Sequence, residues 1–385
     1  MPGSRQLRAA ALLLALCGLA ACARPKPPAA AAAHEWFTLH RWPAGGSSPF
    51  GVAVADFNED GLPDLAVSFA GDDHISLLFG TKDGGFVQGP KWFVGPVSRG
   101  VVATDVNHDG HVDLVVASVH SGMAVVFLGD GHGGASAVSA PAGLAPFNVA
   151  VADLNGDGNP DIVVANESNV PALQGKGVVS VLLGDGTGGF ASSKPLTAGS
   201  FPADVQAADL DGDGKLDLAV VNWDSHDISL FFGNGDGTFR SVPPMPYDGP
   251  PAYSIALGKL HHDALPDIVV GDVIGRVHVL HNDGSGHFAP QRLLGAGAGL
   301  RCVILADMNG DGLLDVVTAN VAAGTLTIRI AKPEGGFAPA HDIPVGVKPR
   351  VVTAADLNHD GKLDLVVTNS GANEVSVLIN NGLDG

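Results

Sequence analysis

Short apolar runs recur along the chain between segments rich in aspartate and glycine. Examples are Leu114–Ala117, Ile162–Ala165 and Leu218–Val221, which contain many β-branched residues. A run of this length, bounded by turn-forming residues, is typical of a strand buried on both faces. A second apolar run such as Ile75–Phe79 follows each of them after a short turn, and it ends in a glycine-rich segment. The pattern therefore predicts pairs of neighbouring strands and no long helix.

The same order of elements repeats seven times. Each repeat contains a short strand ending in a small residue, an aspartate-rich loop, a buried strand, a turn, a third strand, a glycine-rich turn and a fourth strand. The period is about 49 residues, which is typical of a β-propeller blade. Glycine-rich turns such as Gly184–Phe190 pass from strand to strand, so hairpins are favoured over a dinucleotide-binding loop. The sequence predicts an all-β, seven-bladed β-propeller with four-stranded blades.

The last repeat stops before its fourth strand. In most repeats a phenylalanine falls 21 or 22 residues after the last loop aspartate, as Phe86, Phe239, Phe288 and Phe337 do, and the chain ends at Gly385 where the next is due. Phe37 supplies the missing residue near the other end of the chain. We therefore expect the N-terminal strand to complete the last blade, which would remove an open sheet edge.

The aspartate-rich loops have the composition of a calcium site. In the segment Asp209–Asp217, side-chain oxygens at positions one, three, five and nine, and the backbone carbonyl at position seven, can surround a hard cation. Gly214 permits the sharp turn that directs them inward. The segment resembles the start of an EF-hand loop, but it lacks the glutamate at position twelve and the flanking helices. The expected ligands of about six Ca²⁺ ions are Asp56, Asn58, Asp60, Leu62, Asp64, Asp105, Asn107, Asp109, His111, Asp113, Asp153, Asn155, Asp157, Asn159, Asp161, Asp209, Asp211, Asp213, Lys215, Asp217, Asp307, Asn309, Asp311, Leu313, Asp315, Asp356, Asn358, Asp360, Lys362 and Asp364.

The fifth loop, Lys259–Asp267, departs from this pattern. Lys259 replaces the first ligand and Ala264 replaces the turn glycine, although Asp263 and Asp267 remain. We expect no calcium there, with the lysine ammonium as the local positive charge.

The formal charge of −19 is explained largely by these loops, which hold about half of the 40 acidic residues. Such clusters repel without metal, so we expect folding and metal occupancy to be coupled. An acidic chain with few basic clusters argues against nucleic acid as a partner.

The N-terminal residues resemble the signal peptide and lipobox of bacterial lipoproteins. Arg5 and Arg8 precede the apolar run Ala9–Leu16, and small residues lead to Cys22. The resemblance implies a signal peptide at 1–21, lipidation of Cys22 and a location in the bacterial cell envelope, with membrane contact through the lipid only. An ordinary secretory signal is the alternative. Residues 22–34, rich in proline and alanine, are expected to form a tether, and residues 35–385 the propeller.

The repeats resemble the FG-GAP/VCBS class of calcium-binding propeller repeats of bacterial surface proteins and, more distantly, the propeller head of integrin α subunits. The resemblance is carried by the loop pattern Asp-x-Asn/Asp-x-Asp-Gly-x-x-Asp and covers residues 35–385. It implies calcium loops on one face and partner binding commonly on the other. It does not imply one biochemical activity.

The opposite face contains the candidate ligand-binding residues. The residues six positions before each loop, expected around the mouth of the central channel, are Phe50, Arg99, Phe147, Ala203, Tyr253, Arg301 and Arg350. Three arginines among aromatic rings suit an anionic ligand, particularly a carboxylate. The alternative is that they plug the channel and pair with neighbouring acids. Trp223, in a turn of this face, either stacks on a sugar or packs against the next turn, and the long turn 166–176 is a candidate lid or a tolerated insertion.

Catalytic motifs are scarce in the sequence. The 15 histidines lack metal spacing, and no Gly-x-Ser-x-Gly elbow occurs. We therefore expect a monomeric, lipid-anchored binding or adhesion module for a surface protein or glycan rather than an enzyme. The alternatives are a calcium-assisted polysaccharide lyase and a structural spacer in an envelope assembly.

Overall fold

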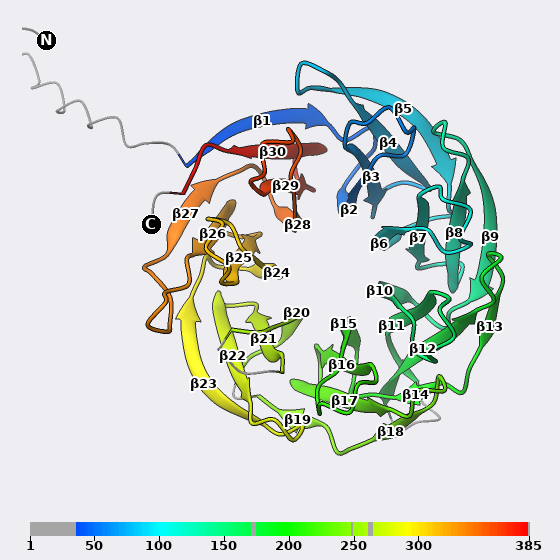
Figure 1. The fold of residues 1–385 in the computed structure, drawn as a ribbon, viewed down its shortest axis with the longest axis vertical. Coiled ribbons are helices and arrows are strands. Elements are labelled where there is room, and N and C mark those ends of the chain that lie inside the picture. The colour runs from blue at the N-terminus through cyan, green and yellow to red at the C-terminus, as the bar shows by residue number, and fades with distance from the viewer. Residues whose placement is uncertain (1–35, 171–174, 248, 261–264, 384–385) are drawn as a thin grey trace, which may run out of the picture. The chain divides into compact units, whose positions relative to one another are not determined.

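The computed structural model describes residues 36–170, 175–247, 249–260 and 265–383. The unit Trp36–Gly385 consists of seven antiparallel sheets arranged around a common centre (Figure 1). This arrangement confirms the predicted all-β, seven-bladed propeller. Within the described residues, no helix has the length and apolarity needed to cross a membrane.

The strands are numbered in chain order, and each blade runs from an inner to an outer strand. The first three blades contain β2 (Pro49–Ala55), β3 (Asp64–Phe69), β4 (His74–Gly80) and β5 (Phe86–Phe93); β6 (Ser98–Thr104), β7 (Asp113–Ser118), β8 (Met123–Gly129) and β9 (Ala135–Pro141); and β10 (Pro146–Ala152), β11 (Asp161–Val170), β12 (Lys176–Gly184), β13 (Phe190–Ser192) and β14 (Leu196–Thr197). The next two contain β15 (Pro202–Ala208), β16 (Asp217–Asn222), β17 (Asp227–Gly233), β18 (Phe239–Ser241) and β19 (Met245–Pro246); and β20 (Ala252–Gly258), β21 (Asp267–Asp272), β22 (Arg276–Asn282) and β23 (Phe288–Gly295). The last two contain β24 (Leu300–Ala306), β25 (Asp315–Asn320), β26 (Thr325–Arg329) and β27 (His341–Pro344); and β28 (Pro349–Ala355), β29 (Asp364–Asn369), β30 (Glu374–Asn380) and β1 (Phe37–Pro43).

The outer strand is interrupted in two blades. The third and fourth blades each have two short outer strands in its place, β13 with β14 and β18 with β19. Pro195, Pro243 and Pro244 lie between them. Proline cannot donate to a strand ladder and is therefore confined to edges and breaks of this kind.

The second strand of each blade is buried between its neighbours. Every residue of β3, β7, β16, β21, β25 and β29 is buried, which confirms the prediction made from their continuous apolar sequence. Adjacent blades share a core: Val115 and Ala117 of β7 pack in one cluster with Ile162 and Val164 of β11. The described residues form seven such clusters, one between each pair of adjacent blades.

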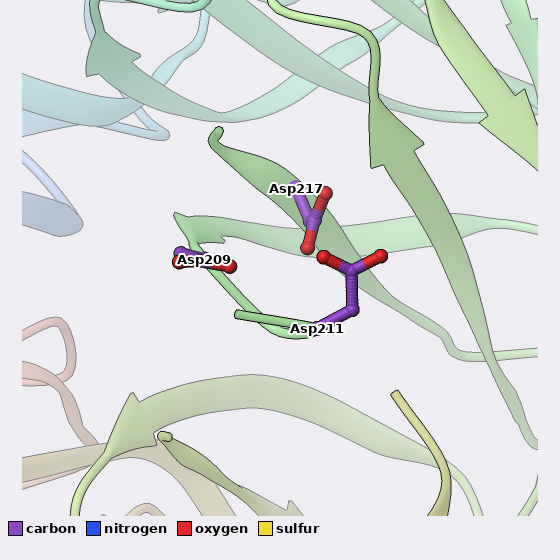
Figure 2. Close-up of side chains that lie close together, drawn as sticks. All are labelled: Asp209, Asp211 and Asp217. Carbon is purple, nitrogen blue, oxygen red and sulfur yellow. The ribbon is translucent and has the colours of Figure 1, made fainter. Parts of the chain in front are cut away.

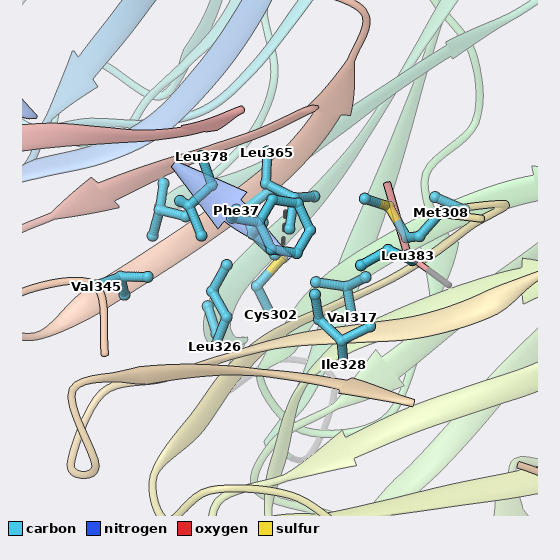
Figure 3. Close-up of a cluster of buried hydrophobic side chains, with 14 of the residues drawn as sticks. Phe37, Cys302, Met308, Val317, Leu326, Ile328, Val345, Leu365, Leu378 and Leu383 are labelled. Atoms are coloured by element: carbon cyan, nitrogen blue, oxygen red, sulfur yellow. Dashed lines mark hydrogen bonds between the residues drawn. The ribbon is translucent and has the colours of Figure 1, made fainter. Parts of the chain in front are cut away.

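The seventh sheet contains strands from both ends of the described chain. β1 is antiparallel to β30, with Phe37 opposite Asn380 and Pro43 opposite Glu374. Phe37 is 7% exposed and lies in a cluster with Leu365, Leu378 and residues of the sixth blade (Figure 3). Burial of such a side chain stabilises a fold by about 1.5–3 kcal/mol.

Candidate calcium loops and an arginine-rich channel mouth

Six aspartate-rich loops have a common backbone conformation. Each joins the first and second strands of its blade, as Asp209–Asp217 joins β15 and β16. Gly214 has φ of 82° and donates its N–H to Asp209 Oδ2 at 3.0 Å. The glycines in the same position donate to the first aspartate of their own loops; they are Gly61, Gly110, Gly158, Gly312 and Gly361. A residue other than glycine is disfavoured at this positive φ.

Among the described residues, three carboxylates converge in the fourth loop. One ligand atom from each of Asp209, Asp211 and Asp217 lies within 4.8 Å of the others (Figure 2). Carboxylate and amide oxygens are the ligands that calcium prefers, and magnesium demands more water and a stricter octahedron. The donor set of these loops therefore fits calcium.

The last aspartate of each loop also has a structural role. Asp217 is buried, and its two oxygens accept N–H groups from Leu210 at 2.8 Å and Gly233 at 2.7 Å. Burial is the main cause that raises the pKa of Asp217 to about 6, and the neighbouring Asp211 and Asp213 raise it further. The pKa values of Asp64 and Asp315 are raised to about 6 for the same reasons. A bound cation would favour the ionised carboxylates and oppose this effect.

The fifth loop retains this structural role without the first ligand. Asp267 is buried and accepts N–H groups from Leu260 at 3.3 Å and Asn282 at 2.9 Å. Lys259 occupies the first position and is exposed. His261, Asp263 and Ala264 lie outside the described residues, so the expected absence of calcium here stays a prediction.

At the other end of the innermost strands, a β-bulge directs one side chain per blade away from the ladder. The pairing register shifts after the first residue in all seven strands, for example between Pro146 and Asn148. A bulge of this type re-orients the side chain that it contains. The second residues of these strands are Phe50, Arg99, Phe147, Ala203, Tyr253, Arg301 and Arg350, the seven positions predicted to surround the channel. We call these seven residues the channel mouth.

Aromatic rings and guanidinium groups are in contact within the channel mouth. The Arg99 guanidinium lies 4.2 Å from the Phe147 ring centre, and that of Arg301 lies 3.5 Å from the Tyr253 ring centre. The Arg350 guanidinium is 5.5 Å from the Phe50 ring centre. Cations over ring faces gain about 0.5–2 kcal/mol, depending on solvent exposure.

Only one of the three arginines has an acidic partner in the described part of the chain. Arg99 forms an ion pair with Glu167 of β11, and Arg350 donates from Nε to Ser370 Oγ at 3.3 Å. Burial lowers the pKa of Arg350, and the positive charges of Arg301 and Arg99 lower it further. The alternative interpretation, that the arginines pair with neighbouring acids, therefore holds for Arg99 but not for Arg301 or Arg350.

A cavity of about 220 Å³ lies over the channel, and its lining includes Phe50, Phe147, Tyr253, Arg301 and Arg350. Asp204 contributes a buried carboxylate to this lining. Its oxygens accept from Asn148 Nδ2 at 2.5 Å and from the Ile255 N–H at 3.0 Å. Burial nevertheless raises the pKa of Asp204 to about 6.

A second, more apolar cavity of about 280 Å³ adjoins the first. It is lined by Trp223, Tyr253, Val273, Gly299, Leu300, Arg301, Val321 and Ala322. Trp223 packs with its ring centre 5.6 Å from that of Tyr253 and 6.1 Å from that of Phe201. The tryptophan thus packs against the neighbouring turns and also lines a cavity.

Three features of the mouth were not predicted from the sequence. Glu167 lies 68 residues from Arg99 in a long hairpin, part of which (171–174) lies outside the described residues. Asp204 has no repeated counterpart in the other blades. The only sequence signal of the bulges is the first residue of each innermost strand, which in most blades is proline or a small residue. This signal is visible only when the repeats are compared.

Comparison with known proteins gave one family and several solved structures. The sequence matches the family described as FG-GAP-like repeat over residues 56–116, 105–164, 170–220, 212–270, 260–318 and 307–367. No curated protein matches the chain. A structure of BBS1N in complex with ARL6DN, soaked with mercury, has a TM-score of 0.65 and 14% identity, covering 90% of this chain and 97% of that one. An Agrocybe aegerita lectin, described as recognising non-reducing terminal N-acetylglucosamine, has a TM-score of 0.56 and 17% identity, covering 88% and 86%. At these identities the similarity shows the fold alone.

Proposed function

The chain belongs to the FG-GAP-like repeat family, and on this premise we propose that it is a calcium-loaded module that binds a surface protein or glycan at the channel mouth. The observation that carries the proposal is the pair of guanidinium groups, from Arg301 and Arg350, that line an open cavity without acidic partners among the described residues. Such groups form strong, oriented hydrogen bonds with anionic ligands.

Calcium would be held by the six complete loops. The side chains at positions one, three, five and nine and the carbonyl at position seven would be its ligands, and the bound ions would neutralise clustered carboxylates. The repeated glycine turns, together with the convergence of Asp209, Asp211 and Asp217, support this assignment. The role of calcium in the proposal is to stabilise the blades that present the mouth.

A binding role is also consistent with the two structural relatives. One is described in complex with a protein, ARL6DN, and the other as recognising a terminal sugar. Neither description concerns catalysis.

We further propose that the protein is anchored outside the cytoplasm through a lipid on Cys22. Small residues before a cysteine, after an apolar segment and two arginines, support the proposal. Residues 1–35 lie outside the described residues, so the support comes from sequence. Mass spectrometry of the mature protein from a bacterial host tests it: an acylated N-terminal cysteine is expected, and an unmodified N-terminus would contradict it.

The binding proposal is tested with the full chain in calcium-containing buffer. Glycan arrays and isolated surface proteins of the source cell are screened for saturable binding, and the same wells are analysed by mass spectrometry for reaction products. We expect saturable binding that is lost on chelation, without products. Shortened or unsaturated sugars would instead indicate a lyase, and silence in both measurements would favour a structural spacer.

A further inference from the structure

The two cavities at the mouth share a wall. Tyr253 and Arg301 line both the cavity over the channel and the apolar cavity beside it. The Arg301 guanidinium lies on the Tyr253 ring, so the charge sits at the boundary between the two. A ligand that fills both cavities would therefore place an anionic group next to an apolar one.

The cavity over the channel is lined by two guanidinium groups and one buried carboxylate, that of Asp204, whose hydrogen bonds go to Asn148 and Ile255. Arg301 and Arg350 contribute positive charges that no carboxylate of the described chain pairs with, in a protein whose formal charge is −19. Partly buried like charges are unfavourable unless a counter-charge is supplied. The planar guanidinium matches the geometry of a carboxylate.

The adjoining cavity favours an aliphatic group over a sugar ring. Its lining includes Val273, Leu300, Val321 and Ala322, and its polar side-chain groups are limited to those of Tyr253 and Arg301, because Trp223 Nε1 is buried. Sugar hydroxyls placed there would gain few hydrogen bonds from the protein. An aliphatic side chain would bury apolar surface without needing such partners.

Exposed apolar side chains lie on the same face. Leu144 and Val347 precede β10 and β28, and Ile274 lies between β21 and β22; their exposed fractions are 66%, 56% and 58%. All three are in turns at the mouth end of their blades. They lie in three different blades, so they can make separate apolar contacts with a partner that spans the mouth.

We propose that the mouth binds a protein partner through a peptide segment in which a carboxylate lies next to an aliphatic side chain. The carboxylate contacts Arg301 and Arg350, and the aliphatic group occupies the cavity lined by Val273 and Val321. This inference rests on the binding function proposed above and specifies its ligand.

The test uses blocked octapeptides of glycine and serine that contain one glutamate and one leucine at spacings from adjacent to three residues apart. Binding to the full chain with calcium is measured by fluorescence anisotropy. We expect the best peptide to weaken at least tenfold when its glutamate becomes glutamine or its leucine becomes serine. Arg301→Gln and Arg350→Gln should weaken it to the same extent. Arg240→Gln is the matched control, because Arg240 also lies over a ring, 4.6 Å from Phe232, but outside the mouth.

Each other outcome contradicts the inference in a distinct way. Equal binding of acidic and neutral peptides would show that the arginines are not the site. Arginine-dependent binding of oligogalacturonate, without peptide binding, would keep the site but replace the peptide by an acidic glycan. Absence of peptide binding in a protein that binds other surface molecules would overturn this inference alone, whereas absence of all binding would overturn the proposed function as well. Unchanged melting of each variant excludes misfolding.

Discussion

The two ends of the innermost strands differ in what they repeat. At the loop end, six blades have nearly the same residues and the same hydrogen bond from the turn glycine N–H to the first aspartate of the loop. At the mouth end, seven blades have the same bulge but different side chains: three arginines, three aromatic rings and one alanine. The loop end therefore repeats side chains as well as backbone, whereas the mouth end repeats the backbone alone and its side chains differ.

The backbone of the mouth is itself under constraint. Ser48, Val97, Ala145, Phe201 and Lys348 precede or closely precede an innermost strand and have φ between 52° and 61°. Non-glycine residues in this region cost about 1–3 kcal/mol each, and Val97, being β-branched, is especially unfavourable. The loop end has the same conformation at Glu59, His108 and His359, with φ between 56° and 59°, so the predictions that separate the two ends concern their side chains.

Removal of calcium should have the largest effect. Six sites at a free calcium concentration tenfold above the dissociation constant would together stabilise the fold by about 8 kcal/mol. We expect EDTA to lower the melting temperature strongly in calorimetry and added calcium to restore it. A melting temperature that is insensitive to both would show that the loops do not bind structural calcium.

Substitution of Asp204, in the channel, should change how the unfolding free energy of the protein depends on pH. Its pKa is about 6 in the folded protein and near 4 when unfolded, so the folded state binds the additional proton. The protonated Asp204 therefore contributes its full share of the unfolding free energy below pH 4. That contribution, roughly 3 kcal/mol, is lost as the pH rises from 4 to 6. In excess calcium, denaturant unfolding of Asp204→Asn should lack this decline, whereas exposed Asp224→Asn should behave as the native protein. Parallel curves for all three proteins would rule out the shift.

Single-loop variants should distinguish the fourth loop from the fifth. Asp213→Ala should remove one ion and about 1.4 kcal/mol of stability at tenfold excess calcium. Asp263→Ala, at a residue outside the described ones, should change neither. Titration calorimetry gives the number of bound ions directly, and equal losses in both variants would show that the fifth loop is occupied.

Arginine variants should have the smallest effect on stability. Arg350→Gln should leave the unfolding free energy within about 1 kcal/mol of the native value, because it removes a partly buried charge near two others. Arg99→Gln should lower the unfolding free energy by about 1 kcal/mol more than Arg350→Gln does, since it leaves Glu167 without its partner. Chemical denaturation checks the order, and a larger loss for Arg350→Gln would assign it a structural role.

The sequence predicted much of the fold because each blade repeats its own pattern. Continuous apolar runs such as Leu114–Ala117 identified the buried strands, and a phenylalanine at a fixed position identified several outer ones, although Phe337 lies in an isolated bridge before β27. The role of Asp217 was predicted only in part. Its spacing indicated a metal ligand, but its contact with the Gly233 N–H requires the end of β17 to lie beside the loop, which spacing does not show. The pairing of Arg99 with Glu167 depends on how adjacent blades meet, and no pattern within one repeat records it.

The sheet formed by β28, β29, β30 and β1 has a consequence for biosynthesis. Thr38 and Asn381 contact each other at a separation of 343 residues, so β1 leaves the ribosome long before its partner exists. Throughout that interval the backbone N–H and C=O groups of β1 that later pair with β30 are available to other chains or to chaperones. A chain that ends before residue 374 would lack β30, so β1 and β29 would both have an unpaired edge. Proteases and quality-control factors could distinguish this product from the finished protein.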